Sequence, residues 1–232
     1  MRRGKDEVLG TEKMEKSKAT HARILEAASK LFYENGYSKT SFDQIAAECG
    51  ITKPLITYHF GAKSALGGEV YSTTLSRFSN LYIIKAQAAM PDVDVIASSI
   101  ACTKAYAEYY KQDERARRFY LELLQAASIE ELGDLEHLYQ SAHGLMDRSF
   151  GDDRVRMIYV ASNYALHGLI KHYLMGEFEG SQDEFLRFFV DVWLGYFEPT
   201  AEEKAQLLGE AAAVIDRVHV RYGPRFTFTI ES

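Results

Sequence analysis

The sequence has little proline and no long hydrophobic run, and both absences narrow the fold class. Only four prolines occur in 232 residues, and no succession of short alternating segments separated by turn residues is visible, so we expect an all-α chain. No apolar stretch approaches the ~20 residues that a transmembrane helix needs. The first residues are highly charged and lack the apolar block of a signal peptide. We therefore expect no membrane partner.

Cysteine and recognised catalytic patterns are also scarce. The only two cysteines, Cys49 and Cys102, show no disulfide or metal-ligand spacing, which favours a reducing, cytoplasmic location. No HExxH, Cys-x-x-Cys, GxxxxGK[ST] or GxGxxG pattern occurs, and no GxSxG marks a nucleophile. We expect no metal, no cofactor and no enzymatic activity.

Charge is distributed unevenly along the chain. The net charge is −6, yet residues 1–63 carry 11 Lys and Arg against 8 Asp and Glu, whereas the remaining residues carry 16 against 25. A mildly basic N-terminal part joined to an acidic body suits a small nucleic-acid-binding module attached to a larger domain.

Residues 41–60 have the pattern of two short helices joined by a tight turn. Ser41 is a favourable N-cap, and Gln44 can complete a capping box with it. Gly50 can adopt the positive φ that often ends a helix. Thr52 is a second N-cap, and a proline follows it near the start of a helix, where proline is tolerated. The stretch predicts a helix-turn-helix, whose second helix can enter the major groove of DNA.

The flanking residues make this pattern specific. A helix with an apolar stripe is predicted from about residue 18 to residue 35, and a long helix from residue 63 to about residue 89. Residues 23–66 contain I-L-x-A-A-x-x-L-F, then G-Y-x-x-T-S, D-Q-I-A-A, G-I-T-K and finally Y-H-F…K-S-A-L. This segment resembles the N-terminal DNA-binding domain of the TetR family of bacterial transcriptional repressors. The chain differs from the family at Thr57, where the family often has tyrosine.

The resemblance implies a fold and a division of the chain. It implies an all-α protein with an N-terminal three-helix helix-turn-helix domain and a C-terminal helical bundle for ligand binding and dimerisation. We expect a flexible tail over residues 1–17, the DNA-binding domain over 18–62 and the C-terminal domain over 63–232. The alternating apolar residues after Tyr222 are assigned to no element.

Candidate DNA contacts come from the exposed positions of the second helix and from the resemblance. Thr52 and Lys53 lie at the helix N-terminus, where backbone N–H groups favour a phosphate. Leu55, Thr57 and Tyr58 point away from the expected core face and can reach base edges. The remaining candidates resemble family positions near the DNA backbone. The full predicted set is Thr40, Thr52, Lys53, Pro54, Leu55, Thr57, Tyr58, His59 and Lys63.

The last two long helices predict a homodimer. The helix from residue 152 to about 175 has two apolar stripes, and residues 185–197 are apolar nearly all round. Helices with two apolar faces bury one against the core and the other against a second subunit, and the economical arrangement is a two-fold dimer. The resemblance likewise implies a four-helix bundle between protomers. The predicted interface residues are Tyr164, Gly168, Phe189, Trp193 and Phe197.

Polar-tipped residues on the apolar faces of the C-terminal domain are candidates for ligand binding. An apolar pocket with a few such groups suits a small molecule, although each residue can equally be a core side chain with a satisfied hydroxyl. A pocket in this domain is implied by the resemblance. The candidates are Tyr106, Tyr110, Tyr139, His143, Asn163 and His167.

These observations predict a cytoplasmic, dimeric repressor that binds a near-palindromic double-stranded DNA operator. A small apolar or aromatic effector would release it by preferring a conformation that no longer fits the DNA. Two alternatives remain at this stage: a DNA-binding regulator without a small-molecule ligand, and a helical enzyme.

Overall fold

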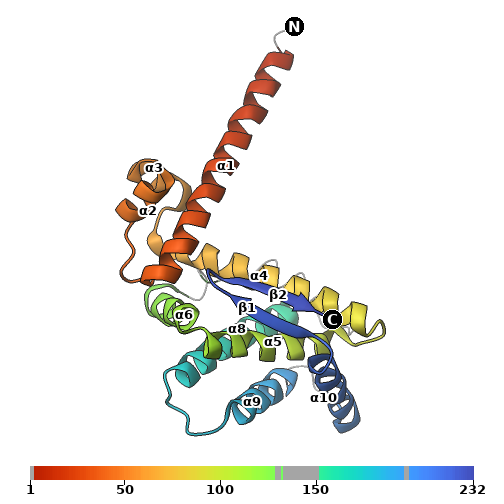
Figure 1. The fold of residues 1–232 in the computed structure, drawn as a ribbon. Helices are drawn as coiled ribbons and strands as arrows, with labels where there is room; N and C mark the ends of the chain where they lie inside the picture. Colours follow the sequence, from red (N-terminus) through yellow and green to blue (C-terminus); the bar gives the residue numbers. More distant parts are fainter. Residues whose placement is uncertain (1–2, 129–131, 133–151, 196–198) are drawn as a thin grey trace.

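A computed structural model describes residues 3–128, 132, 152–195 and 199–232. Its described part is helical apart from one two-stranded sheet near the C-terminus. The first three helices form what we call the head (Figure 1): α1 (Arg3–Asn35), α2 (Phe42–Cys49) and α3 (Lys53–Phe60). The other elements form the body: α4 (Lys63–Ala89), α5 (Val95–Gln112), α6 (Glu114–Ala126), α8 (Asp152–Leu174), α9 (Gln182–Gly195), α10 (Ala201–Ile215), β1 (His219–Gly223) and β2 (Thr227–Glu231).

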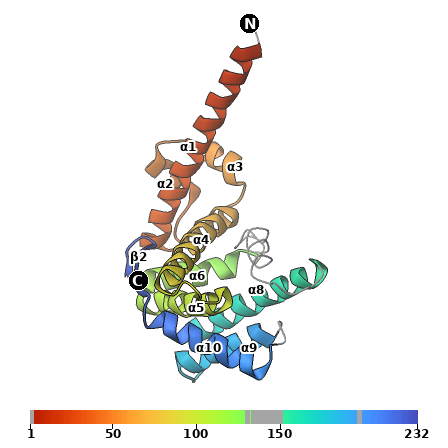
Figure 2. The same cartoon turned by 90° about the vertical axis from the view of Figure 1, so that its right-hand side faces the viewer.

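Helix α1 is longer than expected. Residues 3–17, assigned above to a flexible tail, belong to this helix, which projects away from the rest of the chain (Figures 1 and 2). The segment is rich in Glu and Lys, which favour helix, and Lys18 Nζ lies 3.3 Å from Glu15 Oε1 one turn away. Because residues 3–17 have no apolar stripe, the spacing of apolar residues did not predict this part of the helix.

The helix-turn-helix is confirmed, and the caps of α2 are those that the sequence predicts. The Ser41 N–H donates to Gln44 Oε1 (2.7 Å) and the Gln44 N–H donates to Ser41 Oγ (3.3 Å), which completes the capping box. Gly50 ends α2 with a left-handed backbone, φ +64°. Thr52 occupies the N-cap position of α3, but its side chain makes no capping hydrogen bond.

The head and the body share one hydrophobic core. Phe32 of α1 is fully buried and stacks on Phe119 of α6, with ring centroids 5.5 Å apart. Helix α4 passes so close to this contact that a Cβ on Gly67 would lie 2.7 Å from Leu123 and 2.8 Å from the Tyr37 ring. Any larger residue at position 67 would therefore have to displace the buried side chains of Leu123 and Tyr37.

The body is built around α5, with α4 on one side and α10 along another. The C-terminal residues left unassigned above form an antiparallel hairpin that lies along α4 and α5 (Figure 1). Strand β2 alternates as a half-buried strand does, with Phe228 and Ile230 inward and threonines outward. Among the described helices, none combines the length and the apolar character that crossing a bilayer demands.

Candidate nucleic-acid interface

One face of α3 is buried and the opposite face is open. Ile56 and Phe60 fix the inner face, at 0% and 8% exposed. Tyr58, on the outer face, is 80% exposed, and Leu55 beside it is 36% exposed. Six predicted DNA contacts thus share one exposed surface: Thr52, Lys53, Pro54, Leu55, Thr57 and Tyr58.

Lys53 is held at the start of this surface by a contact within the helix-turn-helix. Its Nζ lies 3.0 Å from Asp43 Oδ2 of α2, and both side chains are more than half exposed. An ion pair so exposed contributes little to stability, about 0–1 kcal/mol. The ammonium can therefore exchange the carboxylate for another anion, such as a phosphate, at small cost.

His59 lies at the edge of the open face and is packed among other rings. It contacts Tyr58 edge-on (5.4 Å between centroids) and His21 of α1 (5.9 Å). His21 in turn stacks on Phe60 (4.5 Å), and its Nε2 lies 3.2 Å from Glu69 Oε1 of α4. His21 thus joins three helices behind the open face. Sequence reasoning missed it, because a single histidine on a helix carries no pattern.

Two predicted contacts, Thr40 and Lys63, do not lie on this surface. Thr40 is 1% exposed, and its hydroxyl donates to Gly36 O at 2.7 Å. Lys63 Nζ donates to Tyr37 O (3.1 Å) and to Thr40 O (3.0 Å), and burial lowers its pKa. Both side chains satisfy backbone groups between α1 and α2 and so connect the head to α4. This differs from the expected phosphate contacts, because the link between the helices folds inward.

Comparison with known proteins agrees with this geometry. Residues 24–70 match the family model for bacterial regulatory proteins of the tetR family. This part of the chain is therefore a TetR-type DNA-binding domain. The chain is 34% identical over 77 residues to the HTH-type transcriptional regulator AcrR of Shigella flexneri, covering 33% of this chain and 35% of that protein. It is 30% identical over 101 residues to the HTH-type transcriptional activator FasR of Mycolicibacterium smegmatis, covering 43% of this chain and 44% of that protein.

The chain therefore spans less than half the length of these curated TetR-family relatives. Solved structures extend the likeness in fold to the body. A TetR regulator from Rhodococcus sp. RHA1 superposes with a TM-score of 0.58 at 12% identity, covering 80% of this chain and all of that one. RolR in complex with resorcinol gives a TM-score of 0.52 at 15% identity, covering 88% and 96%. The named relatives are regulators, which favours a regulator over a helical enzyme.

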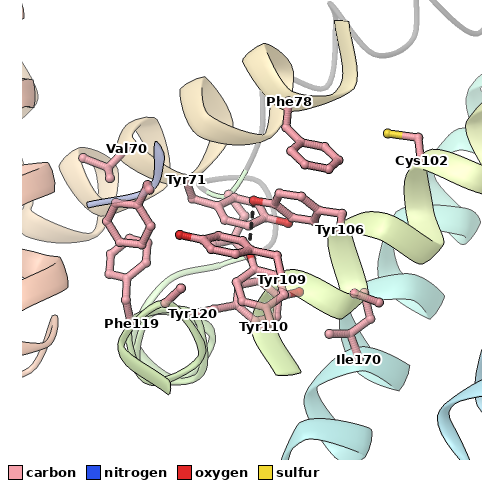
Figure 3. Close-up of a cluster of buried hydrophobic side chains, with 14 of the residues drawn as sticks. Val70, Tyr71, Phe78, Cys102, Tyr106, Tyr109, Tyr110, Phe119, Tyr120 and Ile170 are labelled. Carbon is pink, nitrogen blue, oxygen red and sulfur yellow. Dashed lines mark hydrogen bonds between the residues drawn. The ribbon is translucent and has the colours of Figure 1, made fainter. Parts of the chain in front are cut away.

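The body contains a buried cluster of tyrosines around α5 (Figure 3). Three of the predicted ligand-binding residues lie in it: Tyr106, Tyr110 and His167. The Tyr110 hydroxyl donates to the Tyr106 hydroxyl at 3.0 Å, and the Tyr120 hydroxyl lies 2.7 Å from His167 Nδ1. Tyr110 and Tyr120 stack with centroids 4.6 Å apart. Tyr139 and His143 lie outside the described residues, and so does the side chain of Asn163.

The cluster is uncharged at neutral pH. Burial raises the pKa of Tyr106, Tyr110 and Tyr120 well above the ordinary tyrosine value. Within the described residues, the Tyr109 hydroxyl is buried without a hydrogen-bond partner, and no three His, Cys, Asp or Glu side chains gather as a metal site would require. Neutral phenols and an imidazole can exchange hydrogen bonds with a small polar group but offer no charge to an ion.

His167 makes stability depend on pH. Burial lowers its pKa from 6.5 to about 4, so between these values the unfolded chain binds the proton and the folded chain does not. The unfolding free energy is therefore expected to fall by about 3 kcal/mol as pH drops from 7 to 4. Urea titrations of wild type and His167→Gln at both pH values check this, because the variant should lose that part of the pH dependence. Equal pH dependence in both proteins would contradict it.

A row of apolar side chains on α8 is exposed, as a subunit interface would be before a partner covers it. Met157, Val160 and Tyr164 follow one stripe of α8 and are 64%, 42% and 45% exposed. Gly168 continues the stripe, and a Cβ added there would meet nothing within 4 Å. On α9, Phe188 is 57% exposed.

The exposed side of α9 is not the one expected. Phe189, predicted at the interface, is 5% exposed and packs inside the protomer, whereas its neighbour Phe188 points outward. Trp193 is half-buried, and Phe197 lies outside the described residues. A helix that is apolar nearly all round has no polar face that would indicate which side is exposed. The spacing of apolar residues therefore could not predict which of the two phenylalanines points outward.

Proposed function

We propose that this protein is a dimeric TetR-family transcriptional repressor that binds a near-palindromic DNA operator through the open face of α3. The observation that carries the proposal is this face: a capped helix-turn-helix presents Thr52, Lys53, Leu55, Thr57 and Tyr58 together, while Ile56 and Phe60 hold the helix from behind. Hydroxyls, a phenol, an apolar tip and an ammonium can read base edges and bind phosphates.

The exposed stripe on α8, with Phe188 of α9, supports a two-fold dimer. Residues of one face that repeat along a helix can meet their own copies in an isologous interface. Two heads held in this way would reach successive major grooves about 34 Å apart, which is one turn of B-DNA. The dimer then selects an operator whose half-sites are related by the same symmetry.

We further propose that a small aromatic effector binds the body at the tyrosine cluster and releases the DNA. Buried phenol rings and His167 offer stacking surfaces and hydrogen bonds suited to a neutral aromatic molecule. RolR, which has the same fold, was solved in complex with resorcinol. An effector acts only if it binds the DNA-free conformation more tightly. FasR is named an activator, so a reporter gene placed behind the operator tests the direction of regulation.

Salt-dependent binding tests the DNA contacts. The probe is a duplex that the wild-type protein selects from a random-sequence library. Lys53→Ala should lower the slope of log affinity against log salt by about one, because one phosphate contact is lost. Lys63→Ala is the matched control: it removes the same charge, but from a lysine bound to Tyr37 and Thr40 carbonyls, so the slope should not change.

Two results would contradict the proposal. Failure to select any sequence would refute specific DNA binding, and equal slopes for wild type and Lys53→Ala would refute the phosphate contact. Repeating the titration with a panel of small phenols tests the effector. If none weakens DNA binding, the alternative of a regulator without a small aromatic ligand holds.

A further inference from the structure

The hairpin turn, residues 224–226, has a backbone that its residues rarely adopt. The Thr227 N–H donates to Pro224 O at 3.2 Å and closes the turn. Both central residues, Arg225 and Phe226, have φ +57°. Two positive φ angles are typical of a type I′ turn, in which Asn-Gly is strongly preferred. A bulky residue such as phenylalanine is unusual there, and such strain persists where the surrounding structure uses it.

The two strained residues contact the head. Phe226 is 3% exposed and lies between Tyr33 of α1 and Phe119 of α6, with centroids 5.3 and 5.0 Å away. Arg225 Nη2 lies 2.9 Å from Oε1 of Glu34, also on α1, and Nε donates to the same oxygen at 3.1 Å. An Asn-Gly turn would fit the backbone better but would make neither contact.

The rest of the hairpin is attached to the body. Tyr222 donates its hydroxyl hydrogen to Ala105 O (2.5 Å) and stacks on Tyr109 of α5 (5.1 Å). Arg77 of α4 donates to Phe226 O (2.7 Å) and lies 4.8 Å above the Phe228 ring. The hairpin is thus fixed to α4 and α5 along its length and touches the head at its turn.

Helix α6 holds the same end of α1 from another side. Arg118 Nη2 donates to Tyr33 O (3.3 Å) and Glu34 O (3.1 Å), and Glu122 accepts the Ser38 N–H (2.7 Å). Beside the hairpin turn lies an open groove of about 640 Å³, lined by residues of α1, α2, α4 and the turn itself. The C-terminal end of α1 is thus held by α6 and by the turn, in addition to the contacts that Lys63 and His21 make between the head and α4. Because the groove borders the turn, loss of the turn contacts would leave the head room to tilt on that side.

We propose that Arg225 and Phe226 are positioning residues that set the angle of the head on the body, and so narrow the range of half-site separations that the dimer accepts. The proposal rests on the proposed function. A head free to tilt would still bind a half-site through α3, but two such heads would fit operators of several spacings. The turn residues thereby contribute to operator specificity without touching DNA.

The test variant replaces both side chains and keeps the turn: Arg225→Asn with Phe226→Gly. Arg221→Asn is the matched control, because it removes an arginine from β1 that pairs with Glu231 and not with the head. Spin labels on Ala47 of α2 and Gln112 of α5 report the head–body distance. These positions are exposed, whereas native Cys49 and Cys102 are buried. Diluting labelled protein with unlabelled protein isolates the distance within one protomer.

We expect the distance distribution to broaden in the turn variant and to stay unchanged in the control. An unchanged distribution in the turn variant would overturn the proposal, and this result needs no DNA. If the substitutions in the turn variant unfold the hairpin, a second pair of variants tests the same contact between the turn and the head. Glu34→Arg should broaden the distribution, and adding Arg225→Glu should narrow it again. Failure of that double variant to restore it would also overturn the proposal.

DNA spacing gives the functional readout. The probes are the duplex selected by wild type and the same duplex with one or two base pairs inserted between its half-sites. Preference for the original spacing should fall by about tenfold in the turn variant, the size of one ordinary interdomain contact, while affinity for a single half-site stays unchanged. Undiminished preference would refute the role in specificity. If wild type selects no duplex, the proposed function fails, and the distance measurement still decides whether the turn positions the head.

Discussion

Tyr58→Asp is expected to weaken specific DNA binding by about a hundredfold without unfolding the protein. Tyr58 is 80% exposed, so the folded state loses little when its ring is removed. On DNA, the variant would lose a phenol contact and place a carboxylate beside phosphates, two effects that together reach about 3 kcal/mol. Titration against the duplex selected by wild type measures the loss.

The control for this variant is Ile84→Asp. Ile84 is also an exposed apolar residue, at 60%, but it lies on α4 far along the chain from α3. Both variants should keep the wild-type melting temperature, and only Tyr58→Asp should lose DNA affinity. If the two variants bind DNA equally well, Tyr58 is not at the interface.

Phe188→Asp is expected to raise the dimer dissociation constant by about a thousandfold or more. In a two-fold interface the substitution occurs twice. Each copy would lose an apolar contact and bury an unpaired carboxylate, which weakens the free energy of dimerisation by about 2 kcal/mol or more per copy. Sedimentation velocity over a range of concentrations measures the equilibrium. Affinity for the full operator should fall with it, since one head alone binds a half-site.

Phe189→Asp separates loss of the interface from loss of the fold. Phe189 is 5% exposed inside the protomer, so a charge there should destabilise the monomer by several kcal/mol. Phe188→Asp should instead give a folded monomer with native far-UV circular dichroism. A Phe188→Asp protein that remains a full-strength dimer would place the subunit interface elsewhere.

The helix-turn-helix was predictable because its determinants are local. The capping box of Ser41 and Gln44 and the left-handed Gly50 each act within one helical turn, and the apolar spacing around Ile45 and Ile56 needs no knowledge of distant residues. Such features depend only on residues close by in the sequence, so the sequence alone can predict them. The second apolar stripe of α8 was also predictable from the sequence, because the spacing of its apolar residues along the helix is a local pattern.

The features that could not be predicted from the sequence depend on contacts between segments that are distant along the chain. Thr40 and Lys63 are of residue types that often contact DNA. In the folded protein, however, both side chains donate hydrogen bonds to backbone carbonyls of the link between α1 and α2. The hairpin turn departs from the usual turn chemistry, and only its contacts with Tyr33 and Glu34 account for Arg225 and Phe226. Propensity favours another sequence there, and tertiary contacts override it.

The stacking of Phe32 on Phe119 limits how the head of this protein could be exchanged for that of another protein. A recombination event that brought in a foreign reading domain ending near residue 62 would separate these rings and leave Gly67 facing an unmatched surface. A transferable module would have to include the inner side of α6 as well. If α3 binds the operator as proposed, substitutions on its outer face would change the operator preference without disturbing this packing, whereas replacement of the whole head would disrupt it.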